Sequence, residues 1–236
     1  MPAAAAPAGV PAAELPPANC PLCPRLAAFR AAQRQAHPEW FNAPVPPFGD
    51  PEPELLIVGL APGLRGANRT GRPFTGDYAG ELLYRTLLKS GFATGEYGAD
   101  ITDGLELRRA RITNAVRCVP PQNKPERAEI AACGRFLAAE LAASPSVKAI
   151  LALGAIAHDA VLATKGMRRA RYKFAHGAMH ELPDGTLLAD SYHCSRLNTN
   201  TGTLTPQMFE TVIARLAERL GPPAPLDPAP VSRGDS

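Results

Sequence analysis

The chain has 236 residues, a formal net charge of +3 and a hydrophobic fraction of 45%. That is enough apolar material for one domain with a substantial core, and no apolar run approaches the roughly 20 residues that a helix needs to span a bilayer. The start of the chain also lacks the basic and continuous apolar segments of a signal peptide. We therefore expect a cytoplasmic protein with no membrane association.

Both ends of the chain are rich in proline and alanine. Residues 1–18 and 221–236 have too little apolar surface to bury for stable folding. We expect each of them to be a disordered tail, flanking a single domain at 19–220.

Between the tails, segments with helical spacing alternate with short apolar runs. Strands that alternate with helices form a mainly parallel sheet covered on both faces, so the sequence predicts an α/β fold. In chain order we expect a helix at 24–40, a strand at 54–62, a helix at 77–92, a strand at 109–116, a helix at 124–144, a strand at 147–154, a helix at 155–164, a hairpin at 179–193 and a helix at 205–221.

Three distinctive loops follow strand ends, at 59–77, 114–124 and 193–205. Because ligands bind at the carboxyl ends of parallel strands, we expect these loops to form one cleft. Two further segments are strongly basic: RRARITNAVR at 108–117, and KGMRRARYK at 165–173, which contains no acid. A solvated surface and a phosphate-binding face both fit such segments.

Four of the five cysteines form a pattern. Cys20 and Cys23 make a CxxC pair, and fourteen residues separate Cys118 from Cys133. Disulfides are not expected in a cytosolic chain, and four thiolates suit either tetrahedral zinc or an iron–sulfur cluster. Buried thiols without metal are the third interpretation. Cys194 follows His193, and neighbours on a strand face opposite sides, so we expect Cys194 to be a packed thiol.

The glycine-rich loop GLAPGLRGANRTGRPFTGD covers 59–77. It lacks the order GxxxxGK[ST] and the order GxGxxG, so no nucleotide cofactor is expected. Its glycines allow a ligand close to the backbone. Phe74 is either a platform for a flat ring or a core residue. Asp77, the single acid of the loop, either takes part in chemistry or caps the helix that begins near Tyr78.

Three stretches carry a family resemblance: GLAPG…GANRTGRPFTGD, TNAVRCVPPQNKP and SYHCSRLNTNTGTLT. Together with the four cysteines they resemble the uracil-DNA glycosylase superfamily and, more narrowly, its family 5, the B-type enzymes with an iron–sulfur cluster. The resemblance runs from Cys20 to about Leu220. It implies a three-layer α/β/α fold with a four-stranded, mainly parallel central sheet. It also implies a monomer, associated with the nucleoid in a prokaryotic cytoplasm.

The activity implied by the resemblance is excision of uracil from DNA, and also of hypoxanthine and xanthine, leaving an abasic site. A damaged base would be flipped out of the duplex, stacked on Phe74 and hydrogen-bonded by Asn114. His193 would donate a hydrogen bond to the leaving base, and Asp77 would stabilise the sugar cation and orient the attacking water. Taken singly, Asn114 also fits a turn residue and His193 a core histidine.

The resemblance assigns the remaining positions in three groups. A [4Fe–4S] cluster would be bound by Cys20, Cys23, Cys118 and Cys133. Base contacts would come from Ala61, Pro62, Gly63 and Asn68 in addition to Phe74, Asn114 and His193. DNA contacts would come from Arg65, Arg69, Arg72, Ser195, Arg196, Asn198 and Asn200.

The sequence departs from its relatives at three places. Other branches carry an acid or amide inside the first motif, where this chain has Leu60 and Ala61; Asp77 is the nearest replacement. The last motif has Cys194 in place of a proline, and Arg65 stands where histidine is expected. The alternative function is a non-catalytic, zinc-dependent nucleic-acid-binding module. A redox or radical iron–sulfur enzyme is disfavoured, because four cysteines close the cluster.

Overall fold

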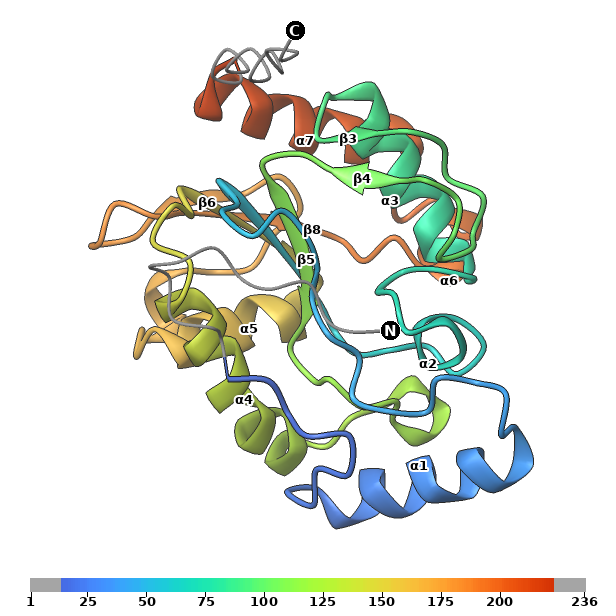
Figure 1. Ribbon diagram of the computed structural model, residues 1–236. Helices are drawn as coiled ribbons and strands as arrows, with labels where there is room; N and C mark the ends of the chain where they lie inside the picture. The colour runs from blue at the N-terminus through green and yellow to red at the C-terminus, as the bar shows by residue number, and fades with distance from the viewer. Residues whose placement is uncertain (1–13, 223–236) are drawn as a thin grey trace, which may run out of the picture.

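The computed structural model describes residues 14–222 (Figure 1). Most of the two predicted tails lies outside these described residues. A six-stranded sheet has the order β1-β5-β2-β6-β8-β7. The four inner strands are parallel, and the two edge strands are antiparallel to their neighbours. The strands are β1 (Phe48–Gly49), β2 (Leu55–Gly59), β5 (Ala110–Asn114), β6 (Ala149–Leu153), β7 (Met179–Glu181) and β8 (Leu187–Ser191).

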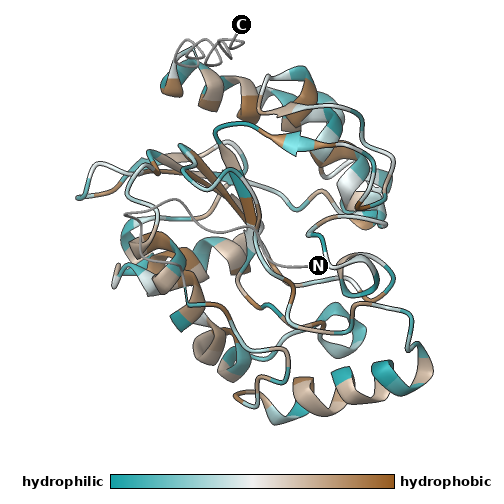
Figure 2. Cartoon of the chain, viewed as in Figure 1, coloured by the Kyte–Doolittle hydropathy of each residue, from teal (hydrophilic) through white to brown (hydrophobic). Residues whose placement is uncertain are grey.

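Helices cover both faces of this sheet (Figure 1). Alternate residues of β2 point to opposite faces: Ile57 lies in the core with α3 (Tyr78–Lys89) and α7 (Pro206–Leu220). Val58 lies in the core with α4 (Arg127–Ala142) and α5 (Ala155–Thr164). The central strands β2 and β6 are accordingly apolar along their length, as strands covered on both faces are (Figure 2). The predicted three-layer fold with four parallel strands is confirmed, with two short edge strands added.

The long predicted elements are all present, α5 with the predicted bounds and the others with shorter ones. The first helix, α1 (Pro24–Ala36), starts with proline in its first turn, where the missing N–H is not needed. It ends before His37, which precedes a proline and so disfavours helix. Short elements were not predicted from the sequence: α2 (Ala67–Thr70), α6 (Arg196–Asn200), the 3₁₀ turns η1 (Pro121–Asn123) and η2 (Arg169–Arg171), and the hairpin of β3 (Ala93–Thr94) with β4 (Glu106–Leu107).

The register of the sheet brings the strand ends together. Gly59 pairs with Asn114, and Leu153 pairs with Ser191, so four parallel strands end along one edge. The predicted loops all leave from this carboxyl edge. No helix within residues 14–222 is both long and apolar enough to cross a membrane.

Candidate active site

An open cavity of about 520 Å³ lies at the carboxyl edge of the sheet. All three predicted loops line it, which agrees with the expectation that they form one cleft. Asp77, Asn114 and His193 come from separate loops and share this cavity with Phe74. The lining also includes Leu60, Ala61, Pro62, Gly63, Ala67, Tyr78, Ala79, Gln122, Asn123, Lys124, Ser195, Arg196 and Leu197.

Phe74 is held in a strained position at the cavity wall. Its φ is +53°, in the left-handed region that non-glycine residues rarely adopt. The hydroxyl of Tyr97 donates to its carbonyl at 3.1 Å, and Tyr84 fixes the carbonyl of Pro73 at 2.6 Å. A Cβ on Gly59 would lie only 2.6 Å from Phe74 Cζ. The strand therefore requires glycine at its end to admit the ring.

Asn114 is a buried amide at the end of β5. Only 3% of it is exposed, yet its Oδ1 has no hydrogen-bond partner among the described residues. A buried amide oxygen without a partner is costly in a folded protein. Because Asn114 lines the cavity, a ligand with an N–H group would satisfy this oxygen.

Asp77 lies half-buried against the glycine-rich loop. Its Oδ1 accepts from the N–H of Gly80 at 3.3 Å and caps the start of α3. A Cβ on Gly63 would lie 3.0 Å from Asp77 Oδ2, and one on Gly66 would collide with the same oxygen. Burial raises the pKa of this carboxyl above its usual range, although the N–H groups of Gly80 and Ala79 oppose the shift. Asp77 thus caps a helix and presents its carboxylate to the cavity.

His193 faces Phe74, with ring centroids 5.9 Å apart. Burial lowers its pKa to about 4, so the ring is neutral near pH 7. A neutral imidazole still carries one N–H, and this ring has no hydrogen-bond partner within the described residues. Asn198 donates to the carbonyl of His193 at 2.8 Å and fixes the backbone there. The ring is therefore free to donate to a ligand.

Two predicted site residues lie elsewhere. Arg72 is 5% exposed and makes paired hydrogen bonds to Asp103 at 2.8 and 2.7 Å, so the expected DNA contact is wrong. It supports the loop below Phe74. Asn68 is fully buried and donates to Asn42 at 2.8 Å. It does not line the cavity, so its expected base contact is wrong as well.

The other predicted DNA contacts surround the cavity mouth or lie near it. Arg65 and Arg69 are exposed beside α2, and Arg196 and Asn200 are exposed on α6. Ser195 caps α6 through the N–H of Asn198.

Sequence reasoning missed Leu197, which is 71% exposed at the rim, and residues 122–124 on another side of it. An apolar residue in a polar loop was the available signal for Leu197.

The four patterned cysteines converge next to this site. Cys20 and Cys23 precede α1, Cys118 follows β5, Cys133 lies in α4, and all four line one hollow. None forms a disulfide. No three of these Sγ atoms, all within the described chain, lie within 4.8 Å of one another. Thiolates on one zinc ion would be about 3.8 Å apart, given Zn–S bonds of about 2.3 Å.

Hydrogen-bond donors contact two of the four sulfurs. The guanidinium of Arg30 donates to Cys118 Sγ at 3.1 Å, and the backbone N–H of Arg117 donates to Cys133 Sγ at 3.3 Å. Burial raises the pKa of Cys23 and of Cys118 to about 11. Without a metal these thiols stay protonated, so metal binding would have to displace their protons. The fifth cysteine, Cys194, is fully buried outside this group, as predicted.

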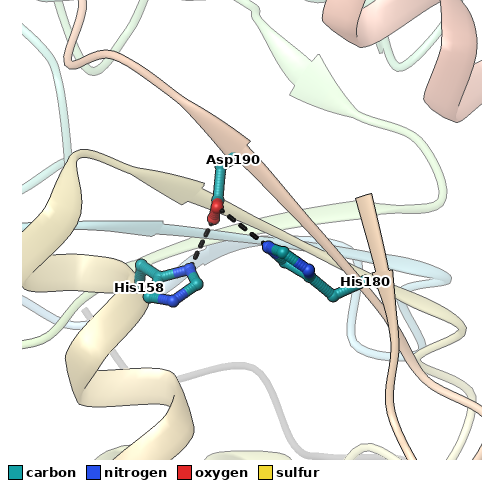
Figure 3. A group of neighbouring side chains, drawn as sticks. All are labelled: His158, His180 and Asp190. Atoms are coloured by element: carbon teal, nitrogen blue, oxygen red, sulfur yellow. Dashed lines mark hydrogen bonds and ion pairs between the residues drawn. The ribbon is translucent and has the colours of Figure 1, made fainter. Parts of the chain in front are cut away.

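A second group of ionisable side chains, His158, His180 and Asp190, lies beneath the sheet edge (Figure 3). His158 Nδ1 lies 2.7 Å from Asp190 Oδ1, and its Nε2 lies 2.8 Å from the carbonyl of Tyr172. A carboxylate and a carbonyl only accept, so His158 carries both ring protons. His158 and Asp190 thus form a buried ion pair, while His180 Nε2 lies 3.4 Å from Asp190 Oδ2 without a hydrogen bond.

Removal of this ion pair should be measurable as a pH-dependent loss of stability. We expect His158→Ala to lower the free energy of unfolding by about 3 kcal/mol at pH 6, because it removes the close partner of the buried Asp190 and leaves only the longer 3.4 Å contacts to His180 and to the N–H of Ala175. Burial lowers the pKa of His158, but Asp190 and the Tyr172 carbonyl outweigh it and raise the pKa overall. The stability that the His158–Asp190 pair contributes is then complete below about pH 6.5, and it is lost as the pH rises through the raised pKa of His158.

Urea unfolding from pH 6 to pH 9 tests this expectation. The difference in the free energy of unfolding between wild type and His158→Ala should shrink as the pH rises. His180, Asp159 and Asp190 are the ionisable groups around the ring and are unchanged in both proteins. The matched control is His37→Ala, at a partly exposed histidine with no buried partner. A difference that grows with pH would contradict the ion pair.

Comparisons with known proteins agree on one family. The model of the uracil DNA glycosylase superfamily matches residues 46–217. A type-5 uracil-DNA glycosylase of Thermus thermophilus is 47% identical over 207 residues, covering 85% of this chain and 93% of that protein. The type-5 enzyme of Mycobacterium leprae is 43% identical over 82% of this chain and 88% of its own. The type-5 enzyme of Pyrobaculum aerophilum is 39% identical over 86% of this chain and 90% of its own.

Proposed function

Because the chain belongs to the uracil DNA glycosylase superfamily, we propose that it excises uracil from DNA by hydrolysing the N-glycosidic bond. The observation that carries the proposal is the meeting of Asp77, Asn114, His193 and Phe74 in one cavity at the sheet edge. The products are free uracil and an abasic site in an unbroken strand.

The cavity accepts a base only after it leaves the duplex. Phe74 offers a ring for stacking. The amide of Asn114 offers an acceptor beside a donor, which matches the N3–H and C4 carbonyl of uracil. Leu197, exposed at the rim, is placed to fill the gap left in the base stack. These three residues define recognition.

Bond cleavage builds positive charge on the sugar and negative charge on the leaving base. The N–H of the neutral His193 ring donates to a uracil carbonyl oxygen as that charge develops. The carboxylate of Asp77 stabilises the sugar cation and orients the water that attacks C1′. The water gives its oxygen to the sugar, and its proton passes to Asp77 or to solvent. Leu60 and Ala61 line the cavity without a side chain that could replace Asp77 in this role.

We extend the proposal to other deaminated bases. The first motif lines the cavity with Leu60, Ala61, Pro62 and Gly63. No acid or amide of this segment restricts the cavity to a pyrimidine, so hypoxanthine and xanthine are also substrates.

Excision assays on duplexes with a single modified base test the function. Uracil, hypoxanthine and xanthine should each give alkali-sensitive sites, and a thymine duplex should give none. Intact strands with all three bases after long incubation would refute the proposed activity. Cleavage of the uracil duplex alone would remove only the extension to purines.

The four cysteines support a [4Fe–4S] cluster. All four line one hollow, and four thiolates beside the positive charge of Arg30 suit a cluster of several irons. Such a cluster would fix the segment before α1 to β5 and α4.

Metal analysis of the purified protein tests this assignment. Wild type should be coloured and hold about four irons per chain, and Cys23→Ser should lose most of the iron. Cys194→Ala is the matched control, because Cys194 is buried outside the group, and it should keep its iron. A colourless wild type with about one zinc per chain would contradict the cluster and favour the binding module.

We also infer that the domain at 19–220 acts as a monomer and without a nucleotide cofactor. Each residue assigned to recognition and catalysis comes from one chain and one cavity. The activity belongs to DNA repair, and we infer that it acts in the cytoplasm, in association with the nucleoid.

A further inference from the structure

The basic segment, residues 165–173, contains unpaired charge at the surface. Lys165 bonds to Asp184, and Arg169 bonds to Asp159. Arg168, Arg171 and Lys173 are exposed and have no ion pair among residues 14–222. A segment that has only positive charges, three of them unpaired, attracts a polyanion.

The segment runs beside the strand end that carries His193. Phe174, the residue after the segment, packs on Tyr192 with ring centroids 6.1 Å apart. His176 Nδ1 accepts from the N–H of Tyr192 at 3.2 Å. Because Tyr192 immediately precedes His193, the C-terminal end of the basic segment approaches the strand end that carries His193, whereas Lys165 at its start bonds to Asp184 in the turn between β7 and β8.

A separate groove between α4 and α5 neighbours the cavity and takes in one residue of the segment. Lys124 lines the cavity, and Pro125 and Arg127 line a neighbouring groove between α4 and α5. Arg169 lines the far part of this groove. The loop after β5 therefore borders both hollows, and the basic side chains continue from one to the other.

The buried ion pair holds the segment in place. The ring of His158 bonds to the Tyr172 carbonyl at 2.8 Å and to Asp190 at 2.7 Å. Tyr172 lies between Arg171 and Lys173, and Asp190 lies three residues before His193 on the same chain. The basic segment and the catalytic strand end are thus tied to one buried anchor (Figure 3). A surface that only needs to be solvated has no need of such an anchor.

We propose that Arg168, Arg171 and Lys173 bind the phosphates of the DNA that flanks the flipped nucleotide. The inference rests on the proposed function, since it takes DNA as the substrate. Guanidinium and ammonium groups bind phosphate oxygens through charge-assisted hydrogen bonds. The anchored segment gives the enzyme a second grip on the backbone, on the side of the cavity away from α2.

Salt titration of DNA binding tests the proposal. The probe is a duplex with a tetrahydrofuran abasic site, and binding is followed by fluorescence anisotropy. Replacing Arg168, Arg171 and Lys173 by Gln should weaken binding and flatten the slope of log K against log salt by about 2.7, at about 0.9 per phosphate contact. The matched control is Lys89→Gln, Arg108→Gln, Arg219→Gln. The control removes three exposed charges at the edge of the sheet opposite the cavity. It should keep the wild-type slope.

Each outcome is decisive for this surface. A test variant with the wild-type slope, or a control that flattens as much, would overturn the proposal. The probe cannot be excised, so the binding result does not depend on catalysis. Wild type that binds with the expected slope but releases no uracil would refute the proposed function and leave this surface standing.

Discussion

Replacing Asp77 by Asn should slow single-turnover excision of uracil by roughly 10³-fold, within the usual range for a positioned acid or base. Asn keeps the shape of the side chain and caps helices as well as Asp, so α3 should stay intact. It lacks the negative charge that stabilises the sugar cation and the basicity that orients water. Rapid-quench measurement at saturating enzyme gives this rate directly.

Two further variants separate chemistry from folding. Asp77→Ala removes both the carboxylate and the cap, and should lose about 1 kcal/mol of stability as well as activity. Thr205→Ala removes the cap of α7 at a residue that does not line the cavity, and should lose similar stability while excising at the wild-type rate. If Asp77→Asn excised uracil normally, the role of Asp77 would be capping alone.

Replacing His193 by Ala should lower the single-turnover rate by about 10²–10³-fold, the usual loss for one donor to a developing anion. The physical reason is that the leaving base then lacks the ring N–H that donates to it as negative charge develops. DNA affinity should change little, because the interaction strengthens only as charge develops. The comparison needs excision rates and binding of the abasic-site duplex.

His193→Gln keeps an N–H donor and should recover part of the rate that His193→Ala loses. A recovery of this kind indicates a hydrogen bond rather than packing. Equal losses in both variants, together with weaker DNA binding, would instead mean that His193 supports the wall next to Phe74.

Much of the fold could be predicted because its long elements have clear periodicity. The runs of β2 and β6 are apolar on both faces, and α3 and α7 begin at capping residues in the sequence. The two-residue strands were not predictable. Their pairing, such as Phe48 with Ile112, depends on tertiary contacts that no local pattern shows.

The site was predictable where residues follow strand ends, and unpredictable where partners are distant in sequence. Asn114 and His193 terminate inner strands, so fold class alone placed them together. Arg72 looked like a DNA contact, since nothing local shows that Asp103 lies opposite it. Asn68 was misassigned for the same reason, because its partner Asn42 is 26 residues away.

Product analysis tests the central claim most directly. Wild type acting on a duplex with one uracil should release free uracil, detected by mass spectrometry, and leave an unbroken strand that alkali cleaves at that position. Asp77→Asn should bind the same duplex and release about 10³-fold less uracil in the same time. Wild type that binds this duplex with no release of uracil would contradict the account.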